Sequence, residues 1–454
     1  MQVHILGVGA IGTLLAGHIR SLMATREAIR AVRASPLTKM PMLPKVSIAP
    51  SLRRHLPRPE ESGVTLLLRE RLRAQSPNKP VYGSIVTVER DGAKMQTSGY
   101  TVEFASSATS APARVIVSEP SGDAHVAKDY DSQAPIECII VTTKADSTLS
   151  ALRRFVHRIT PATTIVLVQN GMGVLESILD NFWRDPSDRP NFILASVTHG
   201  CFLKHPLHTV HAAFGAMHFA ILPNISSGSE AFERSILRQA ESSASYNLDA
   251  IPQTPNTESL RKTVAVLLSM PLDVHWEPIR QFQLRALRKV IVNACINPTT
   301  ALVDCRNGAL FGQSTSMELF ASLCEEASQV LQARARDARA HSQANETDIA
   351  MLSSLPMEDL LTQTDVDGMP LLDASLRPAS MLREVERVIQ STAPNWSSMH
   401  QDVMARRAST EIDYINGYLS ELGRNYGIPT PINDTLVSLV KLKTQRRSGE
   451  LVSP

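Results

Sequence analysis

Three polar side chains recur at four-residue intervals in an otherwise apolar stretch. They are Lys289, Asn293 and Asn297. Four residues turn an α-helix about 40° past a full turn, so the three side chains would share one stripe. Burying an ammonium and two carboxamides costs several kcal/mol unless each finds a hydrogen-bond partner, so a buried stripe would bind a polar ligand. The same spacing also fits the solvated edge of a surface helix, where Lys and Asn are common.

A glycine-rich hexapeptide follows the first apolar segment and opens a helical pattern. It consists of Gly7, Val8, Gly9, Ala10, Ile11 and Gly12. In a GxGxxG fingerprint the first glycine permits a tight turn, the second admits a pyrophosphate, and the third lets helix and strand pack closely. The N–H groups at the helix start would hold the phosphates. An ordinary glycine turn is the alternative, but the position between strand and helix favours dinucleotide binding.

The end of the second predicted strand indicates which dinucleotide is preferred. NAD sites usually place an acidic residue there, whereas this strand ends in Arg69. A guanidinium can pair with a 2′-phosphate through two charge-assisted hydrogen bonds, which favours NADPH. A solvent-facing basic turn is the alternative, and Glu70 could itself approach a ribose. The long stretch between Gly12 and Arg69 must loop out for this assignment to hold.

Two further polar residues follow predicted strands. Lys144 ends the segment Val-Thr-Thr-Lys, and Asn170 opens the turn Asn-Gly-Met-Gly. Both would lie at the carboxyl edge of a parallel sheet, where such folds bind ligands. Each also fits a plainer role, Lys144 as an exposed lysine and Asn170 as a turn former.

The pattern around these residues predicts an α/β fold with a helical second part. Strands are expected at 64–68, 84–89, 100–104, 114–117, 136–143, 164–169, 192–199 and 217–222, with helices at 11–22, 149–158 and 260–269. This alternation is typical of a mostly parallel, doubly wound sheet of the Rossmann type. From about Arg280 the strand pattern disappears, and helices are expected at 317–340, 382–391 and 411–426, the last closing at Gly427.

The length of 454 residues exceeds one hydrophobic core and predicts two domains. We place a Rossmann-type nucleotide-binding domain at 1–278, with insertions near 24–61 and 224–257. A helical substrate-binding and catalytic domain follows at 279–454, with an insertion near 342–378.

The bulk composition argues against some classes of binding partner. The net charge of +2 provides no global field for nucleic acid or an anionic membrane, and no apolar stretch approaches the length of a membrane span. The five cysteines lack metal-ligand spacing, so reduced thiols are expected. We therefore expect a soluble cytoplasmic protein with a small-molecule substrate. A mitochondrial location stays open, although no N-terminal presequence is visible.

Taken together, these segments resemble the 2-dehydropantoate 2-reductase (ketopantoate reductase) family of pantothenate and coenzyme A biosynthesis. The matching motifs are GVGAIG, VTTK, QNGMG, RKVIVNACINPTTAL, RNG, SSMHQD and TEIDYINGYL. They span both ends of the chain, and the last two are specific to the family. The resemblance implies NADPH-dependent hydride transfer to the C2 carbonyl of ketopantoate, giving pantoate.

The resemblance also implies a role for each matching residue. On the cofactor side, Gly7 to Gly12 would hold the pyrophosphate, Arg69 the 2′-phosphate, and Lys144 and Asn170 the nicotinamide half, with a backbone contact at Cys201. On the substrate side, Lys289 would be the general acid, Asn293, Asn297 and Asn307 would bind polar groups, and Asn395, Ser397 and Ser398 would hold the carboxylate end. Glu411 would be catalytic and complete the cofactor-side network. No metal is required, because an ammonium can polarise the carbonyl.

Two local features modify these expectations. The segment from Ser398 to Glu411 is one residue longer than the family pattern, which makes the placement of Glu411 a point to check. Pro298 disfavours helical geometry at the residue before it, so Asn297 is expected at a helix end or kink.

Two alternatives remain open. One is a reductase of the same fold that acts on another 2-oxo acid. The other is a non-catalytic nucleotide-binding scaffold that uses its basic insertion, from Arg26 to Arg58, for partner contacts. Few aromatic residues interleave that insertion, whereas base-stacking platforms need them, so a solvated loop is favoured. The oligomeric state is open and includes a homodimer.

Overall fold

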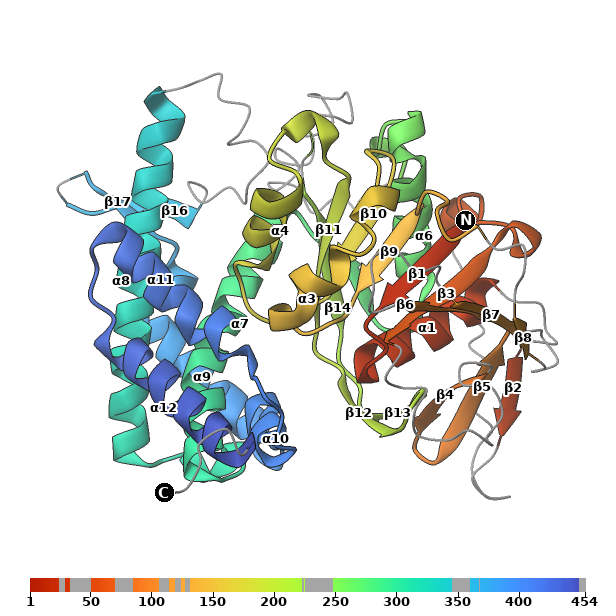
Figure 1. Ribbon diagram of the computed structural model, residues 1–454. Helices are drawn as coiled ribbons and strands as arrows, with labels where there is room; N and C mark the ends of the chain where they lie inside the picture. The colour runs from red at the N-terminus through yellow and green to blue at the C-terminus, as the bar shows by residue number, and fades with distance from the viewer. Residues whose placement is uncertain are drawn as a thin grey trace. The chain divides into compact units, whose positions relative to one another are not determined.

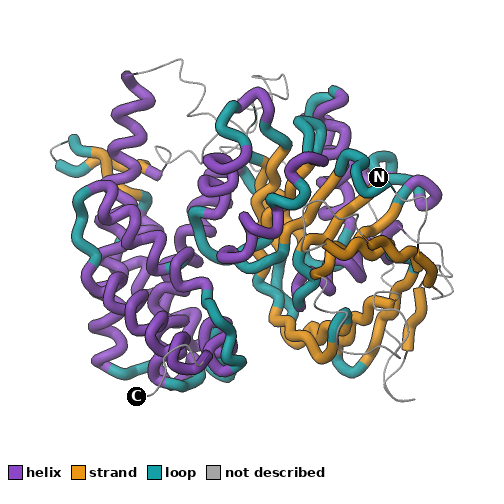
Figure 2. Tube along the Cα trace, in the orientation of Figure 1, coloured by secondary structure: helices purple, strands orange, loops and turns teal. Residues whose placement is uncertain are grey.

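The computed structural model describes residues 1–23, 29–32, 50–69, 85–105, 114–118, 124–126, 131–222, 224, 248–344, 360–366 and 368–448. Two compact units contain them (Figure 1). The first comprises Met1–Gln169 and Phe182–Ile279, and the second comprises Asn170–Asn181 and Arg280–Pro454. Strands gather in the first unit and helices dominate the second (Figure 2).

A ten-stranded sheet in the described residues forms the centre of the first unit, in the order β15-β14-β11-β10-β9-β1-β3-β6-β7-β8. Its strands are β1 Gln2–Leu6, β3 Gly63–Arg69, β6 Thr101–Ala105, β7 Arg114–Ser118, β8 Ala124–Val126, β9 Cys138–Val141, β10 Thr164–Leu167, β11 Asn191–Val197, β14 Met217–Ile221 and β15 Val274–Trp276. The six strands from β11 to β6 pair in parallel. The predicted doubly wound α/β fold is confirmed.

A second sheet of the first unit, in the order β12-β13-β4-β5-β2, packs on helix α1. Its strands are β2 Ile29–Val32, β4 Ile85–Arg90, β5 Ala93–Ser98, β12 Gly200–His205 and β13 His208–Ala213, and α1 spans Ala10–Met23. Because α1 contacts strands of both sheets, apolar side chains such as Leu14, Leu15 and Ile19 are buried along it. Among these strands only β4 was predicted, and β2 lies inside the stretch expected to be an insertion.

The described residues of the first unit contain three further helices, of which those at 145–152 and 258–269 overlap predicted helices and the one at 50–53 lies in a stretch expected to be an insertion. They are α2 Pro50–Arg53, α3 Ala145–Leu152 and α6 Glu258–Ser269, with short 3₁₀ turns η2 Pro59–Glu61, η4 Val156–Arg158, η5 Pro186–Asp188, η8 Leu248–Ala250 and η9 Pro255–Thr257. The helix expected at 149–158 begins earlier and breaks, because the chain turns between Leu152 and Phe155 before η4. In the core, Arg158 Nη1 lies 3.0 Å from both carboxylate oxygens of buried Glu103, tying η4 to β6.

The second unit is helical, as predicted. It contains α4 Val174–Phe182, α7 Ile279–Val303, η10 Asn307–Leu310, α8 Ser314–Ala344, η13 Ala374–Leu376, α9 Pro378–Ser391, α10 Ser398–Met404, η14 Glu411–Tyr414, α11 Asn416–Tyr426 and α12 Pro431–Ser448. Gly427 ends α11 with a φ of +66°, the left-handed conformation that favours glycine. Within the described residues, no helix combines the length and apolarity that a membrane crossing requires.

Three details of the second unit differ from expectation. The strand pattern does not vanish, because β16 Leu361–Thr364 and β17 Pro370–Leu372 form a hairpin around Gly368. The helix expected at 411–426 is interrupted at Ile415, whose φ and ψ are −114° and −90°. Finally, α7 runs through Pro298, so of the two positions expected for Asn297, a helix end or a kink, the helix end is wrong.

Burial of His4 predicts an acid-sensitive fold. His4 lies in β1 with 3% of its surface exposed, and burial lowers its pKa from 6.5 to about 4. Between these two pH values the unfolded chain binds the proton and the folded chain does not, so the free energy of unfolding falls as pH drops from about 6.5 to 4. The fall amounts to about 3 kcal/mol for this side chain.

Urea unfolding at pH 7 and pH 4.5 measures this effect. Lowering the pH from 7 to 4.5 should reduce the free energy of unfolding of both proteins. We expect this reduction to be about 2 kcal/mol smaller in His4→Leu than in the unmodified protein. Some loss should persist, because burial also lowers the pKa of His18 to about 4. An identical loss in both proteins would contradict the assignment to His4.

Candidate active site

The glycine loop joins β1 to α1 in the first unit. Gly7 has a φ of +99°, and a Cβ there would lie 2.5 Å from the Thr143 nitrogen. A Cβ on Gly12 would overlap the Gly7 carbonyl oxygen and lie 2.5 Å from Thr142 Oγ1. The first and third glycines are therefore required by the contact of β1, α1 and the end of β9, as the fingerprint predicts.

The middle glycine differs from its neighbours. A Cβ on Gly9 would meet no atom of the described residues within 4 Å, so no contact among them explains the absence of a side chain there. The space beside Gly9 lies before the first turn of α1, whose N–H groups attract anions. This geometry fits a pyrophosphate approaching the backbone, which is the role of the second glycine in such loops.

The sheet order brings three predicted cofactor residues to one edge. Because β9, β1 and β3 are parallel neighbours, Lys144, Gly7 and Arg69 all lie at or just beyond their carboxyl ends. Lys144 precedes α3 in an extended conformation. The Arg69 side chain lies outside the described ones, as do Glu70 and the residues after it.

Cys201 is not on that edge. It lies on β12 of the second sheet, packed against the core of the first unit. Burial raises the pKa of its thiol to about 12, so the side chain is a poor nucleophile. The backbone contact to the cofactor that the resemblance implies for Cys201 stays a prediction.

The stripe of Lys289, Asn293 and Asn297 lies on α7 in the second unit. Asn297 is buried, and Lys289 and Asn293 are partly exposed. Burial lowers the pKa of the Lys289 ammonium from 10.5 to about 8, against a nearby carboxylate, Glu411, that raises it. A lysine on a solvated helix edge would not be desolvated in this way. Lys289 therefore differs from a lysine on a fully solvated helix edge, and Asn297 is buried further along the same stripe.

Glu411 begins η14 and is 8% exposed. The extra residue before it is absorbed between α10 and η14, where Arg406 adopts a positive φ of 52°. Glu411 still acts on Lys289. The longer spacing therefore still leaves the Glu411 carboxylate near enough to raise the pKa of the Lys289 ammonium.

The loop that begins at Asn170 belongs to the same unit as Glu411. The Met172 nitrogen donates to the Tyr414 oxygen at 2.9 Å, and a Cβ on Gly171 would lie 2.6 Å from that oxygen. Gly171 has a φ of +88°. Asn170 is thus held beside the segment that carries Glu411, although the two are far apart in sequence.

The remaining predicted substrate residues gather around the start of α10. The Asn307 nitrogen donates to the Asn395 oxygen at 3.0 Å, and buried Asn307 donates through Nδ2 to Thr392 Oγ1 at 2.9 Å. Asn395 and Ser398 are exposed. The structure therefore brings the segments of Asn307 and Asn395 together.

Ser397 has a structural task that the sequence did not reveal. Its Oγ accepts from the His400 nitrogen at 3.1 Å and caps α10. Thr300 Oγ1 donates to the same oxygen at 2.7 Å, joining α10 to α7. The signal was present as a serine three residues before a buried helical position. We interpret Ser397 as a cap that positions Ser398.

These observations define a class of protein. A glycine loop at the carboxyl edge of a parallel sheet, followed by a helical unit carrying a buried ammonium and carboxylate, is typical of two-domain dinucleotide-binding proteins. In the described part of the chain, no three His, Cys, Asp or Glu side chains gather as a metal site.

Comparison with known families gives a more specific result. The profile described as ketopantoate reductase PanE/ApbA matches residues 60–224, and its C-terminal counterpart matches residues 281–444. The chain belongs to the ketopantoate reductase PanE/ApbA family.

Individual relatives agree with this family. The chain is 27% identical over 310 residues to a probable 2-dehydropantoate 2-reductase of Schizosaccharomyces pombe, covering 67% of this chain and 73% of that protein. It is 26% identical over 321 residues to the 2-dehydropantoate 2-reductase of Saccharomyces cerevisiae, covering 69% and 75%.

Solved structures share the fold at low sequence identity. A probable 2-dehydropantoate 2-reductase from Bacillus subtilis matches with a TM-score of 0.54 and 17% identity, over 98% of this chain and 100% of that one. A D-mandelate dehydrogenase with NADH and anilino(oxo)acetate matches with a TM-score of 0.56 and 17% identity, over 98% and 99%.

The glycine geometry predicts different outcomes at two positions of the loop. Gly9→Ala adds a methyl group to open space, so the protein should fold with an unchanged melting temperature but bind NADPH at least about tenfold more weakly. Gly12→Ala forces β1 and α1 apart and should lower the melting temperature by several degrees. Thermal unfolding and NADPH fluorescence titration measure both. Unchanged NADPH affinity in Gly9→Ala would contradict the proposed pyrophosphate position.

Proposed function

We propose that this protein reduces 2-dehydropantoate to pantoate with NADPH, in pantothenate and coenzyme A biosynthesis. The observation that carries the proposal is the buried ammonium of Lys289 under the influence of the Glu411 carboxylate. The names of the yeast relatives support the substrate, and the glycine loop supports a dinucleotide. A cytoplasmic location and a homodimer stay predictions.

In this proposal Lys289 supplies the proton for the reaction. A reduced nicotinamide supplies the hydride to the C2 carbonyl of the 2-oxo acid. As negative charge develops on the carbonyl oxygen, an ammonium directed at it lowers the barrier and donates its proton. With a pKa of about 8, Lys289 is still protonated at neutral pH, yet it is a stronger acid than an ordinary lysine. Glu411 helps to keep it charged.

The amides give the reaction its geometry. Asn293 and Asn297 follow Lys289 by four and eight residues on α7, so all three lie along one stripe of the helix. The two amides can therefore hold the carbonyl and hydroxyl of one small substrate. Asn307 would bind the substrate from η10, and the exposed groups Asn395 and Ser398 would bind its carboxylate. Ser397 would contribute by ordering α10.

The first unit would hold the cofactor. Gly7 to Gly12 would bind the pyrophosphate and Arg69 the adenosine 2′-phosphate, while Lys144 would approach the nicotinamide half. Asn170 and Glu411, which belong to the second unit, are the other residues proposed to contact the cofactor. Arg69 lies at the position that distinguishes NADPH from NADH in this kind of sheet, which supports NADPH.

The alternatives are less well supported. A scaffold would have no use for a buried lysine, because desolvating an ammonium costs stability unless it is paired. Most of the basic segment from Arg26 to Arg58 lies outside the described residues. A reductase for another 2-oxo acid would use the same acid and amides, so the substrate must be tested directly.

Turnover of ketopantoate tests the proposal. Purified protein should oxidise NADPH when ketopantoate is added, with NADPH preferred over NADH by at least about tenfold if Arg69 binds the 2′-phosphate. Lys289→Ala should lose a factor of about 10² to 10⁴ in kcat, because the acid is missing, while NADPH affinity is retained. Intact turnover in Lys289→Ala would rule out this acid. Activity only with other 2-oxo acids would support the second reductase hypothesis.

The lowered pKa of Lys289 predicts the alkaline limb of the pH profile. The reaction needs the protonated amine, so kcat should fall as pH rises through about 8. In Glu411→Gln the carboxylate that raises the pKa is gone, so the limb should move to lower pH. Stopped-flow measurement of a single turnover isolates the chemical step. A limb near pH 10 would show that Lys289 is not desolvated during catalysis.

A further inference from the structure

Pro298 removes one backbone hydrogen bond from the interior of α7. Proline has no N–H, so the carbonyl of Ala294, four residues earlier, lacks the donor that a helix normally provides. Ala294 is 1% exposed, so water cannot replace that donor. An unpaired buried carbonyl costs about 1 to 3 kcal/mol. Another part of the molecule must supply the bond.

Asn416 supplies it. Its Nδ2 donates to the Ala294 oxygen at 3.1 Å, and the residue is fully buried. Ala294 follows Lys289 by five residues on α7, and Asn416 follows Glu411 by five residues at the start of α11. The bond therefore joins the segment that carries the ammonium to the segment that carries the carboxylate.

The Asn416 amide is oriented by a chain of buried partners. Its Nδ2 also donates to Asn433 Oδ1 at 3.0 Å, and Asn433 Nδ2 donates to Glu326 Oε2 at 2.7 Å. Carbonyl and carboxylate oxygens at the two ends only accept, so each amide can face only one way. The network thus fixes the donor that faces Ala294.

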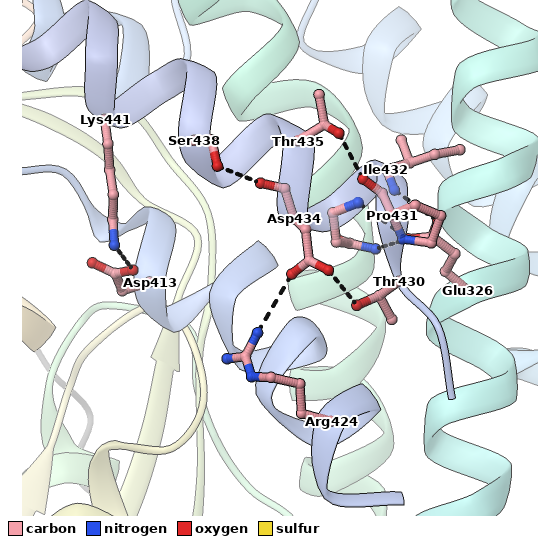
Figure 3. Close-up of polar contacts among 11 residues, drawn as sticks. Glu326, Asp413, Arg424, Thr430, Pro431, Ile432, Asp434, Thr435, Ser438 and Lys441 are labelled. Carbon is pink, nitrogen blue, oxygen red and sulfur yellow. Dashed lines mark hydrogen bonds and ion pairs between the residues drawn. The ribbon is translucent and has the colours of Figure 1, made fainter. Parts of the chain in front are cut away.

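Glu326 forms the end of this hydrogen-bond network and binds the start of α12. Its two carboxylate oxygens accept from the backbone nitrogens of Ile432 and Asn433 at 2.9 and 3.1 Å. Figure 3 shows Glu326 beside Pro431 and Ile432, and Lys441 bonded to Asp413. A carboxylate at a helix N-terminus is favourably placed. Helices α7, α8, α11 and α12 therefore meet through one buried polar chain.

We propose that Asn416 is a positioning residue for the reaction, because its bond to Ala294 O sets the place of the Glu411 segment against the Lys289 helix. This inference rests on the proposed function for its kinetic consequence. Asn416 itself touches neither reacting group in this scheme and acts through the two segments that it joins.

The test uses Asn416→Leu, which keeps the number and branching of the side-chain heavy atoms and removes both donated bonds. We expect kcat for ketopantoate reduction to fall by about ten- to a hundredfold, since small misplacements of reacting groups have effects of this size. The KM for NADPH should change less than about threefold. The Lys289 pKa should fall, because Glu411 no longer supports the charge.

Two further variants separate positioning from stability. Pro298→Ala places an N–H where it can donate to Ala294, so the double variant with Asn416→Leu should recover part of the lost kcat. Asn191→Leu is the matched control, because Asn191 is also a buried amide bonded to backbone carbonyls but lies on β11 in the first unit. It should lower the melting temperature and leave kcat and the Lys289 pKa unchanged.

The Lys289 pKa is measured by NMR of ¹³Cε-labelled lysine, assigned with Lys289→Arg. An unchanged or raised pKa in Asn416→Leu, or a double variant no more active than Asn416→Leu, would overturn the proposal. If the unmodified protein does not reduce ketopantoate, the proposed function fails, and the NMR titration still decides whether Asn416 holds Glu411 at Lys289.

Discussion

The desolvated ammonium of Lys289 is the constraint on which the second unit depends. Burial withdraws water from the charge, and the Glu411 carboxylate compensates in part, leaving a pKa of about 8. The two groups come from α7 and η14, more than a hundred residues apart in sequence. Among the described contacts, the hydrogen bond from Asn416 Nδ2 to the Ala294 oxygen joins the segments that carry these two groups.

Close backbone packing constrains the glycine loop of the first unit. The glycine loop brings the backbones of β1, α1 and the end of β9 so close that side chains are excluded at Gly7 and Gly12. Only Gly9 is free of such contacts. Short-range packing thus explains two of the three glycines, and among the described residues no contact explains the third. This distinction separates the structural part of the fingerprint from its binding part.

The sequence predicts those features whose signal is local. The parallel strands are continuous apolar runs and could be located, and the glycine loop and the Lys289 stripe follow from spacing alone. The strands β12 and β13 were missed, because β12 alternates poorly and is mostly exposed. The cap formed by Ser397 and the hydrogen bond that compensates for Pro298 inside α7 were missed for another reason. Each depends on a partner far along the chain, Thr300 in one case and Asn416 in the other.

The second unit is built from two separate segments of the chain, which affects the order in which its contacts form during synthesis. Asn170–Asn181 leaves the ribosome with the first unit, yet it packs with the helices of the second. The Met172 nitrogen can donate to the Tyr414 oxygen only after Tyr414 has been synthesised. The contacts of this segment with the second unit therefore form only after the later helices have been synthesised. For the same reason, a cut near residue 280, or a gene fusion that exchanges one half, would separate Asn170–Asn181 from the helices that it packs with.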